Sequence, residues 1–377
     1  MSKKTLHECA IITMGQSPNS KSYNGHGDGL PFYQGNADFG EINPIRRYYC
    51  NKPSKIANRN DILLSVRAPI GAVNIAVETC CIGRGLCAIS EKRDITYYKY
   101  LYYFLLSRHT ELNSKGTGST FKAISKSILL ELSISLPPIE EQKRISRILD
   151  KVNDLISLKK KQISKLDLLV KSRFVEMFGD VLHSEYETQA LDKIADIGSS
   201  KRIYASEYVD YGIPFYRSKE IRELGDGERP SVELFITKER YSEIKVKYGI
   251  PSKGDILIAA IGATIGYMWV IDTDQPFYYK DGNLILISNI KAGNALFFQE
   301  VLKQLIEEYK RVGVSGSAQL ALTIEKVEKM RVPIPPIDLQ NQFADFVQQV
   351  DKLEFELQKS LNELTTLYNA LMQKYFG

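Results

Sequence analysis

The 377-residue sequence contains no run of roughly 18 or more consecutive apolar residues, which excludes a helix that spans a membrane. Its first segment, "MSKKTLHECAIITMGQ", has two lysines but neither a long apolar stretch nor a small-residue cleavage site, so we expect no secretory signal peptide. A cytoplasmic protein is therefore expected. The apolar fraction of 44% and the charged fraction of 25% are those of an ordinary globular protein, and the length suits two or three domains.

The sequence has only five cysteines. Their odd number, the absence of a Cys-x-x-Cys spacing and the strain of a bond between adjacent cysteines argue against a disulfide framework. We therefore predict reduced thiols within core strands, as is usual in the cytosol. The five are Cys9, Cys50, Cys80, Cys81 and Cys87.

Sequence signatures of catalysis are also missing. The four histidines lack the HxxxH or HExxH spacing of a metal site, and "GTGST" (116–120) lacks the lysine of a phosphate-binding Walker loop. No GxSxG hydrolase elbow occurs, and neither "LPPI" nor "IPPI" fits the [DNS]PP[YFW] motif of amino-methyltransferases. Glu243 and Lys245 form an ExK doublet, but no Pro-Asp pair precedes it. We therefore predict a binding or scaffolding protein without a catalytic, metal or cofactor site of its own.

The net charge of +5 is unevenly distributed along the chain. Residues 1–139 carry 17 basic and 10 acidic side chains, a net +7, and residues 140–179 carry 10 and 6, a net +4. Residues 180–337 carry 20 and 23, and residues 338–377 carry 3 and 6, so each is −3. The basic first part favours a polyanionic partner, whereas the third part does not through its bulk charge.

The chain is an internal repeat. "LPPIEEQ" (136–142) returns 198 residues later as "IPPIDLQ" (334–340), and Phe178-Gly179 returns as Phe376-Gly377. Two earlier pairs follow the same order: "GLPFYQGN" (29–36) with "GIPFYRSK" (212–219), and "NDILLSVRAPIGAV" (60–73) with "GDILIAAIGATIGY" (254–267). The unit is therefore a domain of about 140 residues with a tail of about 40, used twice.

Each tail is predicted to form one long helix. The double proline marks its start, acidic residues occupy its first turn, and no glycine or proline interrupts 140–178 or 338–376. Thirty-nine residues give a rod of roughly 58 Å. Apolar side chains at three- and four-residue spacing predict that the two helices form an antiparallel coiled coil with pseudo-two-fold symmetry, although two separate helices docked on their own domains remain an alternative. The predicted seam is Ile145, Ile148, Val152, Leu155, Leu166 and Leu169 with Val350, Leu353, Leu357, Leu364, Leu367 and Leu371.

The two globular regions are predicted to be mixed α/β (α+β). "DILLSVR" and "DILIAAI" are typical of buried strands, and residues 97–107 and 294–311 are typical of helices. The aromatic pair of each Pro-Phe-Tyr repeat should lie in the core. The expected organisation is two globular domains, 1–137 and 180–335, each followed by a spacer helix, 138–179 and 336–377.

Two globular units, each followed by a rod, suit a bipartite DNA target. A rod of roughly 58 Å corresponds to between one and two turns of B-DNA, which repeats in about 34 Å. Because the loops of the two units differ, the two blocks of sequence should differ, with a spacer of fixed length between them.

These repeated motifs, together with "GSTFKAI" (118–124), resemble the DNA-specificity subunit of Type I restriction–modification systems over essentially the whole chain. The resemblance implies a non-catalytic subunit that binds double-stranded DNA and joins two methyltransferase subunits for adenine methylation with S-adenosylmethionine. It also implies recruitment of restriction motor subunits that use ATP and Mg²⁺. Alternatives are the recognition subunit of a related multisubunit Type II enzyme and a coiled-coil scaffold that binds proteins.

The second copy departs from this pattern at two places. "GSTFK" becomes "GSAQL" (316–320), and Glu141 becomes Leu339. With its −3 charge, the second domain is expected to make fewer phosphate contacts than the first.

Loop residues with polar or cationic side chains are the candidates for DNA contact, since such groups read base edges and phosphates. Those directly after the two Pro-Phe-Tyr segments rank highest. In the first domain the candidates are Lys21, Tyr23, Gln34, Asn36, Arg46, Arg47, Arg67, Lys115, Thr117, Ser119, Thr120 and Lys122. In the second they are Arg202, Tyr204, Arg217, Ser218, Lys219, Lys310, Arg311, Ser315, Ser317 and Gln319.

Apolar helix positions beside the predicted seam are candidates for binding the methyltransferase subunits. An equal alternative is that they only widen the intramolecular seam. They are Ile156, Ile163, Val170, Phe174, Phe343, Phe346, Leu361 and Tyr368.

Overall fold

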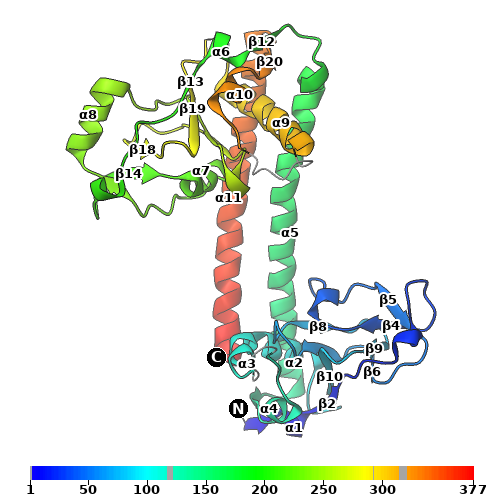
Figure 1. Cartoon of the computed structure of the whole chain (residues 1–377). Helices are drawn as coiled ribbons and strands as arrows, with labels where there is room; N and C mark the ends of the chain where they lie inside the picture. Colours follow the sequence, from blue (N-terminus) through cyan, green and yellow to red (C-terminus); the bar gives the residue numbers. More distant parts are fainter. Residues whose placement is uncertain (1, 117–121, 292, 314–320) are drawn as a thin grey trace. The chain divides into compact units, whose positions relative to one another are not determined.

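The computed structural model describes residues 2–116, 122–291, 293–313 and 321–377. The chain divides by its contacts into two compact units (Figure 1). Unit 1 comprises Met1–Lys159 with Ser360–Gly377, and unit 2 comprises Lys160–Lys359. Each unit therefore contains a segment of both long helices, α5 (Ile139–Phe178) and α11 (Ile337–Phe376). The four sequence ranges proposed for recognition domains and spacers stay a prediction.

Unit 1 is built on two sheets and a two-stranded ribbon. The first sheet is antiparallel, in the order β2-β10-β7-β8, and the second has the order β3-β5-β4-β9-β6 with β4 and β9 parallel. The strands of the first sheet are β2 (Ala10–Met14), β7 (Ile62–Ser65), β8 (Val73–Ile75) and β10 (Leu86–Glu91). Those of the second are β3 (Tyr23–Asn24), β4 (Leu30–Tyr33), β5 (Tyr48–Cys50), β6 (Ile56–Ala57) and β9 (Cys80–Ile82). The ribbon pairs β1 (Ser2–Thr5) with β11 (Ser133–Leu136).

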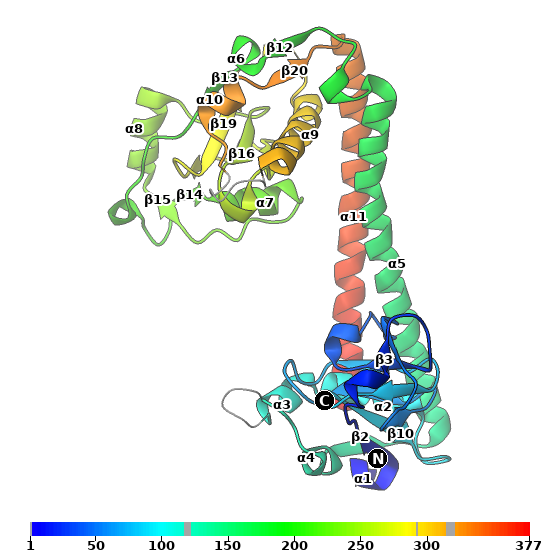
Figure 2. The ribbon, with the colours of Figure 1, turned by 45° about the vertical axis from the view of Figure 1, so that its right-hand side comes forward.

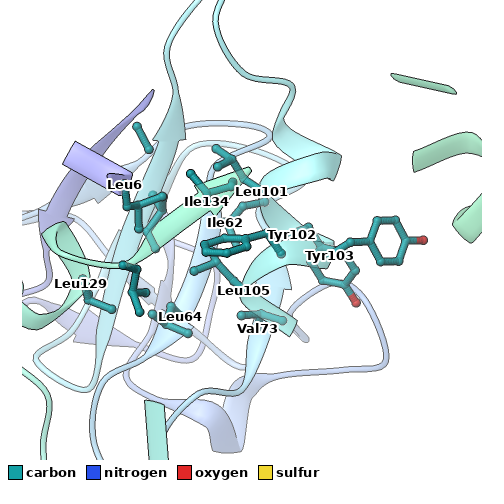
Figure 3. Close-up of a cluster of buried hydrophobic side chains, with 14 of the residues drawn as sticks. Leu6, Ile62, Leu64, Val73, Leu101, Tyr102, Tyr103, Leu105, Leu129 and Ile134 are labelled. Carbon is teal, nitrogen blue, oxygen red and sulfur yellow. The ribbon is translucent and has the colours of Figure 1, made fainter. Parts of the chain in front are cut away.

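The main core of unit 1 lies between the first sheet and a helix that carries many aromatic and leucine side chains (Figure 3). The "YYKYLYYFLLS" segment forms α2 (Tyr98–Ser107), as the sequence predicts, and Leu101 and Leu105 face Ile62 and Leu64 of β7. Burying one such apolar side chain contributes about 1.5–3 kcal/mol, so this contact fixes the helix on the sheet. The other short helices of the unit are α1 (Leu6–Cys9), α3 (His109–Ser114) and α4 (Lys126–Leu130).

Unit 2 repeats the four-stranded sheet strand for strand and keeps three strands of the second sheet, in the order β15-β14-β18. Its sheet β13-β19-β16-β17 has the order of β2-β10-β7-β8, and β14 pairs parallel with β18 as β4 does with β9. The internal repeat read from the sequence is therefore a repeat of topology. The strands are β12 (Thr188–Ala190), β13 (Asp196–Gly198), β14 (Ile213–Tyr216), β15 (Phe235–Ile236), β16 (Ile256–Ala259), β17 (Met268–Val270), β18 (Tyr278–Tyr279), β19 (Leu284–Ser288) and β20 (Arg331–Pro333).

The units differ in what lies between the strands. Between β14 and β16 unit 2 has two helices, α7 (Ser218–Gly225) and α8 (Lys238–Tyr248), whereas the equivalent part of unit 1 contains β5 and β6. The remaining helices of unit 2 are α6 (Leu191–Ile194), α9 (Ala295–Gly313) and α10 (Ile324–Glu328). Single 3₁₀ turns are η1 (Ser20–Ser22), η2 (Asn36–Asp38), η3 (Val181–His183), η4 (Ala205–Glu207) and η5 (Gly262–Thr264).

The two long helices pack antiparallel within each unit (Figures 1 and 2). In unit 1 the end of α11 joins the core around the start of α5, where Phe376 lies 5.0 Å from Tyr100 between ring centroids. In unit 2 the end of α5 joins the core around the start of α11, where Phe174 lies 5.3 Å from Phe343. In the described part of either unit, no Lys or Arg of one helix forms an ion pair with an Asp or Glu of the other. Apolar packing joins the two helices, together with a cation–π contact in unit 2, where the Arg173 guanidinium of α5 lies 5.9 Å from the centroid of the Phe346 ring of α11.

The predicted seam has the wrong register at four of its positions. Leu155, Leu169, Leu353 and Leu367 are 46%, 46%, 57% and 47% exposed. The positions next to them in sequence, such as Ile156, Val170 and Tyr368, are the more buried ones. Both helices carry apolar side chains at consecutive positions, so two registers fit the spacing. At these four positions the neighbouring residue is the more buried one, whereas Ile145, Val152 and Val350 are buried as predicted.

The repeated Pro-Pro segment ends on a buried glutamine in unit 1. Gln142 is 1% exposed, and its Oε1 accepts from the Tyr97 backbone N–H at 2.9 Å. Its Nε2 donates to the carbonyls of Ile95 and Pro137, both at 2.9 Å. One side chain therefore ties the start of α5 to the segment that leads into α2.

Unit 2 repeats this junction. Gln340 is fully buried, accepts from the Asn294 N–H at 3.0 Å and donates to the Pro335 carbonyl at 2.9 Å. A buried amide that satisfies several backbone groups cannot be exchanged for an apolar or shorter side chain without leaving those groups unpaired. This explains why proline and glutamine recur together in both copies.

The replacement of Glu141 by Leu339 has a structural reason. Glu141 forms an ion pair with Arg144 at 2.6 Å on the surface of unit 1. In unit 2 the position equivalent to Arg144 is Gln342, and Leu339 is partly buried against the core. The second copy thus lacks both members of the ion pair and has an apolar contact in its place.

Among the described residues, no helix is both long enough and apolar enough to cross a membrane.

Candidate nucleic-acid interface

Two of the predicted DNA-contacting residues of unit 1 line one shallow pocket. Tyr23 of β3 and Gln34 after β4 meet there with Asn24, Gly25 and Tyr48, around a volume of about 430 Å³. Tyr48 is 52% exposed, so its ring is available at the rim. Two contacts fix the Tyr23 side chain: its ring centroid lies 4.6 Å from that of Phe32, and its hydroxyl donates to the Pro18 carbonyl at 2.8 Å.

Gln34 has a fixed backbone and an exposed side chain. Its N–H donates to the buried carboxylate of Asp38 at 2.7 Å, and its carbonyl accepts from the Gly85 N–H at 3.1 Å. A Cβ on Gly85 would lie 2.3 Å from the Gln34 carbonyl oxygen, so this close approach requires glycine. Both backbone groups are therefore occupied, and the exposed side chain carries an amide, a group of the kind that can read a base edge. Asn36 follows at the start of η2 and is half-buried.

Three of the cationic residues predicted to contact DNA lie close in sequence to the residues that line this pocket. Arg46 forms an ion pair with Glu78. Arg47 and Lys21 are exposed, and neither forms an ion pair with any other described residue. Their charge is therefore available to a phosphate group, whereas that of Arg46 is partly neutralised.

A second group of candidates lies around the end of β7. Arg67 forms a β-bridge with Ala123, and the Lys122 carbonyl accepts from the Ala68 N–H at 3.2 Å, so Arg67 and Lys122 are neighbours. Both side chains are exposed without an ion pair to the residues that the structure describes. Lys115 instead pairs with Glu111 at 2.6 Å. Thr117, Ser119 and Thr120 lie outside the described residues.

The candidates that ranked highest in unit 2 are bound to carboxylates. Arg217 contacts Glu220 at 2.9 Å and Glu233 at 2.8 Å, and Lys219 contacts Glu233 at 2.8 Å. These hydrogen bonds, that of Lys219 first, lower the pKa of the Glu233 carboxyl to about 2. Ser218 begins α7 beside them, and its Oγ is buried without a partner among the described residues. A network of this kind stabilises the start of α7 and leaves little free charge for DNA.

The remaining candidates of unit 2 are scattered. Arg202 pairs with Asp281 at 2.8 Å, and Arg311 pairs with Glu308 at 2.6 Å. Tyr204 is 62% exposed, and Lys310 is half-buried beside Gly266. Ser315, Ser317 and Gln319 lie outside the described residues. The structure thus brings no large group of these residues together.

Sequence reasoning missed a basic surface on unit 2. Lys201, Lys245 and Lys247 are exposed, and none of the three forms an ion pair with another described residue. The signal was present, because residues 238–253 carry five basic and two acidic side chains within an otherwise acidic region. The net charge summed over the whole domain conceals this basic segment.

The aromatic pairs and the cysteines are internal, as predicted. Phe32, Tyr33 and Phe215 are each 1% exposed, and Tyr216 is also buried. All five cysteines are buried free thiols, and burial raises the pKa of Cys87 to about 12. In residues 2–116, 122–291, 293–313 and 321–377, no three His, Cys, Asp or Glu side chains gather as a metal site would require.

Three of the residues proposed to bind a partner subunit are not accessible. Phe174 and Phe343 are fully buried in the core of unit 2, and Leu361 is 9% exposed. The structure places these three side chains in the packed interior, which is what the alternative of a wider intramolecular seam expects. Ile156, Ile163, Val170, Phe346 and Tyr368 are half-buried. The accessible apolar helix positions are Leu155, Leu158, Leu168, Leu169, Val175, Ile337, Leu353, Phe355 and Leu367.

Comparison with known families gives two matches along the chain. The family model described as "Type I restriction modification DNA specificity domain" matches residues 1–168 and again residues 183–366.

Curated relatives carry the same description. The putative type I restriction enzyme MjaX specificity subunit of Methanocaldococcus jannaschii is 46% identical over 156 residues, which are 41% of this chain and 37% of that protein. The MjaIX specificity subunit of the same organism is 25% identical over 401 residues, covering 98% of this chain and 91% of that protein. The first match therefore spans little more than a third of its relative, and the second spans nearly all of it.

Solved structures have the same fold. The S subunit of a Type I restriction–modification system from M. genitalium aligns over 100% of this chain and 96% of its own, with a TM-score of 0.65 and 19% identity. A chain from a study of complex assembly in the type I R-M system aligns over 100% and 97%, with a TM-score of 0.59 and 18% identity. The mixed α/β architecture, with each sheet region followed by a long helix, is thereby confirmed.

Proposed function

Because the chain belongs to the Type I restriction–modification DNA specificity family, whose members determine which DNA target is recognised, we propose that it reads an asymmetric bipartite sequence in double-stranded DNA. The observation that carries this proposal is one framework used twice with different insertions. The sheet β2-β10-β7-β8 and the sheet β13-β19-β16-β17 share their strand order, while the segment between β14 and β16 contains the helices α7 and α8 and the segment between β4 and β7 contains no α-helix. Two different recognition surfaces imply two different blocks of bases.

The spacer between the two blocks is proposed to have a fixed length. Helices α5 and α11 each run for 40 residues without glycine or proline, and 40 residues of α-helix measure about 60 Å. Uninterrupted helices of this length are stiffer than loop linkers, which favours one spacing over a range of spacings.

The chemistry is proposed to belong to partner subunits. Family membership supports assembly with two methyltransferase subunits that bind S-adenosylmethionine and methylate adenine, and with restriction motor subunits that bind ATP and Mg²⁺. We expect this assembly in the cytoplasm, with the specificity chain holding no cofactor of its own.

The methyltransferase subunits are proposed to dock on the exposed apolar positions of the helices. Leu155 and Leu158 are three residues apart on α5, and Leu168 and Val175 are seven apart, so each pair shares a helix face. Exposed leucines on a helix whose seam is already filled mark a surface for another protein. Ile163 and the half-buried positions beside it are proposed to contribute at the rim.

The function is tested by selection from a random duplex library. The full chain, co-expressed with the methyltransferase subunits encoded beside it, is incubated with the library, and bound duplexes are sequenced. We expect enrichment of two different short blocks at one spacing. Enrichment of a single block, or of two blocks at variable spacing, contradicts the bipartite proposal. No enrichment at all, with stable protein complexes, favours the coiled-coil scaffold.

The same preparation separates the two restriction classes. A complex that methylates the selected duplex but needs the motor subunits and ATP for cleavage is of Type I. Cleavage by a complex without ATP supports the related multisubunit Type II assembly.

A further inference from the structure

Helix α8 is an addition to unit 2 that the repeated framework does not require. It lies at the outer edge of the unit, beyond the small sheet of β14, β15 and β18 (Figures 1 and 2). Ile244 is its only fully buried residue and packs into the cluster that contains Phe215 and Trp269. Because this helix contributes only one fully buried side chain to the core, a functional role would depend on its exposed residues.

The buried side of α8 is firmly fixed. Thr237 caps its N-terminus by accepting from the Arg240 N–H at 3.1 Å, and the Arg240 guanidinium contacts Glu207 at 2.7 Å and Glu243 at 3.1 Å. Gly249, with φ of +76°, ends the helix in a conformation that favours glycine. The exposed side is therefore held in one orientation.

The last turn of α8 presents cations and an aromatic ring. Lys245 and Lys247 are exposed, as are Val246 at 87% and Tyr248 at 58%. Lysines in the last turn are favoured by the partial negative charge at the end of the helix, so their placement costs no stability.

A loop from elsewhere in unit 2 extends this surface. The Nζ of Lys201 lies 5.3 Å from the centroid of the Tyr248 ring, and the Lys201 backbone N–H donates to the Tyr278 hydroxyl at 2.7 Å. Lys201 is thus positioned beside α8 although it is more than 40 residues away in sequence. Lys245 shares a helix face with Tyr248, three residues further on, whereas Lys247 lies on the other flank of the same turn. Lys201, Lys245, Lys247 and Tyr248, on both flanks of this turn, are together called the α8 surface below.

The α8 surface differs from the other basic groups of unit 2 in its free charge. Arg217, Lys219 and Arg202 all contact carboxylates within 3 Å. The three lysines of the α8 surface form no ion pair with any described residue. A phosphate can approach an unpaired ammonium group without displacing a carboxylate, and it releases a condensed counterion from DNA when it does so.

We propose that the α8 surface is the phosphate-binding surface of unit 2, by which DNA is held while neighbouring loops read the bases. The proposal rests on the function proposed above and deepens it, since it names the DNA backbone as the ligand of this surface. It also explains how a domain with a net charge of −3 can bind a polyanion: the positive charge is concentrated at one edge. Tyr248 would contact sugar or stack at the same edge.

The test uses the full chain with its methyltransferase subunits and the duplex enriched from the random library. Lys201, Lys245 and Lys247 are replaced by alanine together, and binding is measured from 50 to 200 mM salt. Because this variant cannot neutralise three phosphates that the wild type neutralises, the slope of log K against log salt should become less negative by about 2–3. Affinity should fall by a similar factor for the selected duplex and for a scrambled duplex, because phosphate binding carries no sequence information.

The matched control removes the same formal charge elsewhere on unit 2. Lys165, Lys291 and Lys352 are all exposed and, like the α8 lysines, form no ion pair with another described residue; their triple alanine variant should keep the wild-type slope. Equal slopes for wild type and the α8 variant overturn the proposal while leaving the proposed function intact. Loss of co-purification with the methyltransferase, without a change in slope, also overturns it and assigns the surface to a protein. Failure of the wild-type complex to select any duplex instead refutes the proposed function itself.

Discussion

At the scale of single residues, the two buried glutamines explain what the repeated Pro-Pro segment does in the fold. Gln142 and Gln340 occupy equivalent positions and satisfy backbone groups that no other side chain reaches in the described structure. From the sequence, the segment is recognisable as a helix start, because prolines and acidic residues are local signals. The role of the glutamine is not recognisable, since only its proline partner is local and the partners that it ties to the helix start, such as Tyr97 and Ile95, lie 45 to 47 residues away.

Replacing either glutamine by alanine should destabilise the protein strongly. In Gln142→Ala the Tyr97 N–H and two carbonyls are left without their partner inside the core, which costs about 2–4 kcal/mol. Gln340→Ala should have a comparable effect. Urea denaturation of the full chain measures both, and Gln162→Ala, at an exposed position of α5, is the control. A change of less than about 0.5 kcal/mol in both variants would contradict the role assigned to the junction.

Glu300 on α9 gives the stability of unit 2 a dependence on pH. The side chain is 3% exposed, and burial raises the pKa of its carboxyl despite Lys303 at 3.8 Å. A carboxyl with a raised folded-state pKa adds stability below its unfolded value, near 4.5, and this contribution is lost as pH rises through the folded value. Glu300→Gln should therefore raise the melting temperature at pH 8, and have little effect at pH 4.5.

Thermal melting of the full chain at the two pH values measures this effect. Each kcal/mol of added stability corresponds to about 2–4 °C for a unit of this size. Glu356→Gln, at an exposed position on α11, should change neither melt. A variant that melts lower than wild type at pH 8 would show that the carboxylate is stabilised by its surroundings.

At the scale of elements, the sequence predicts which segments are helices and strands better than it predicts which side of each element is buried. The long helices, α2 and α9, and the strands β7 and β16 all lie where the sequence places them. The seam between α5 and α11 differs from the prediction at four positions, because Leu155 and Ile156, or Leu169 and Val170, satisfy the same spacing equally well. Only packing against the cores decides between them, and the core residues involved are distant in sequence.

The aromatic ends of the long helices are predicted to anchor them. Phe376 is 4% exposed and packs against Tyr100 and Phe104 of α2, while its carbonyl accepts from the Arg108 guanidinium at 2.7 Å. Phe376→Ala should cost about 2–4 kcal/mol, since removing a large side chain leaves a cavity in the core of unit 1. Leu367→Ala on the same helix, at an exposed position, should cost less than about 0.5 kcal/mol. Equal costs in the two variants would mean that α11 is held along its length and not at its end.

At the scale of the whole molecule, the two repeated units are expected to contribute differently to DNA binding, and their net charges alone do not show how. The sequence indicates a basic first domain and an acidic second one, and the departures from the family pattern favour fewer phosphate contacts in the second. The structure adds that Arg67 of unit 1 is replaced at the equivalent β-bridge of unit 2 by Ile261. The sequence does not predict which loop residues lie together, because the positions of loops depend on the sheets that carry them.

Two single variants of unit 1 should separate base reading from phosphate binding in the full complex. Lys122→Ala should weaken binding to every duplex alike and make the salt slope less negative by about 1. Gln34→Ala should leave the slope unchanged and relax preference at one position of one block, by about 1–3 kcal/mol of discrimination. Sequencing of duplexes selected by each variant measures the preference, and Lys151→Ala, exposed on α5, controls for charge. If Gln34→Ala lowered affinity equally for all sequences, its fixed backbone and free amide would have to be explained by binding the DNA backbone instead.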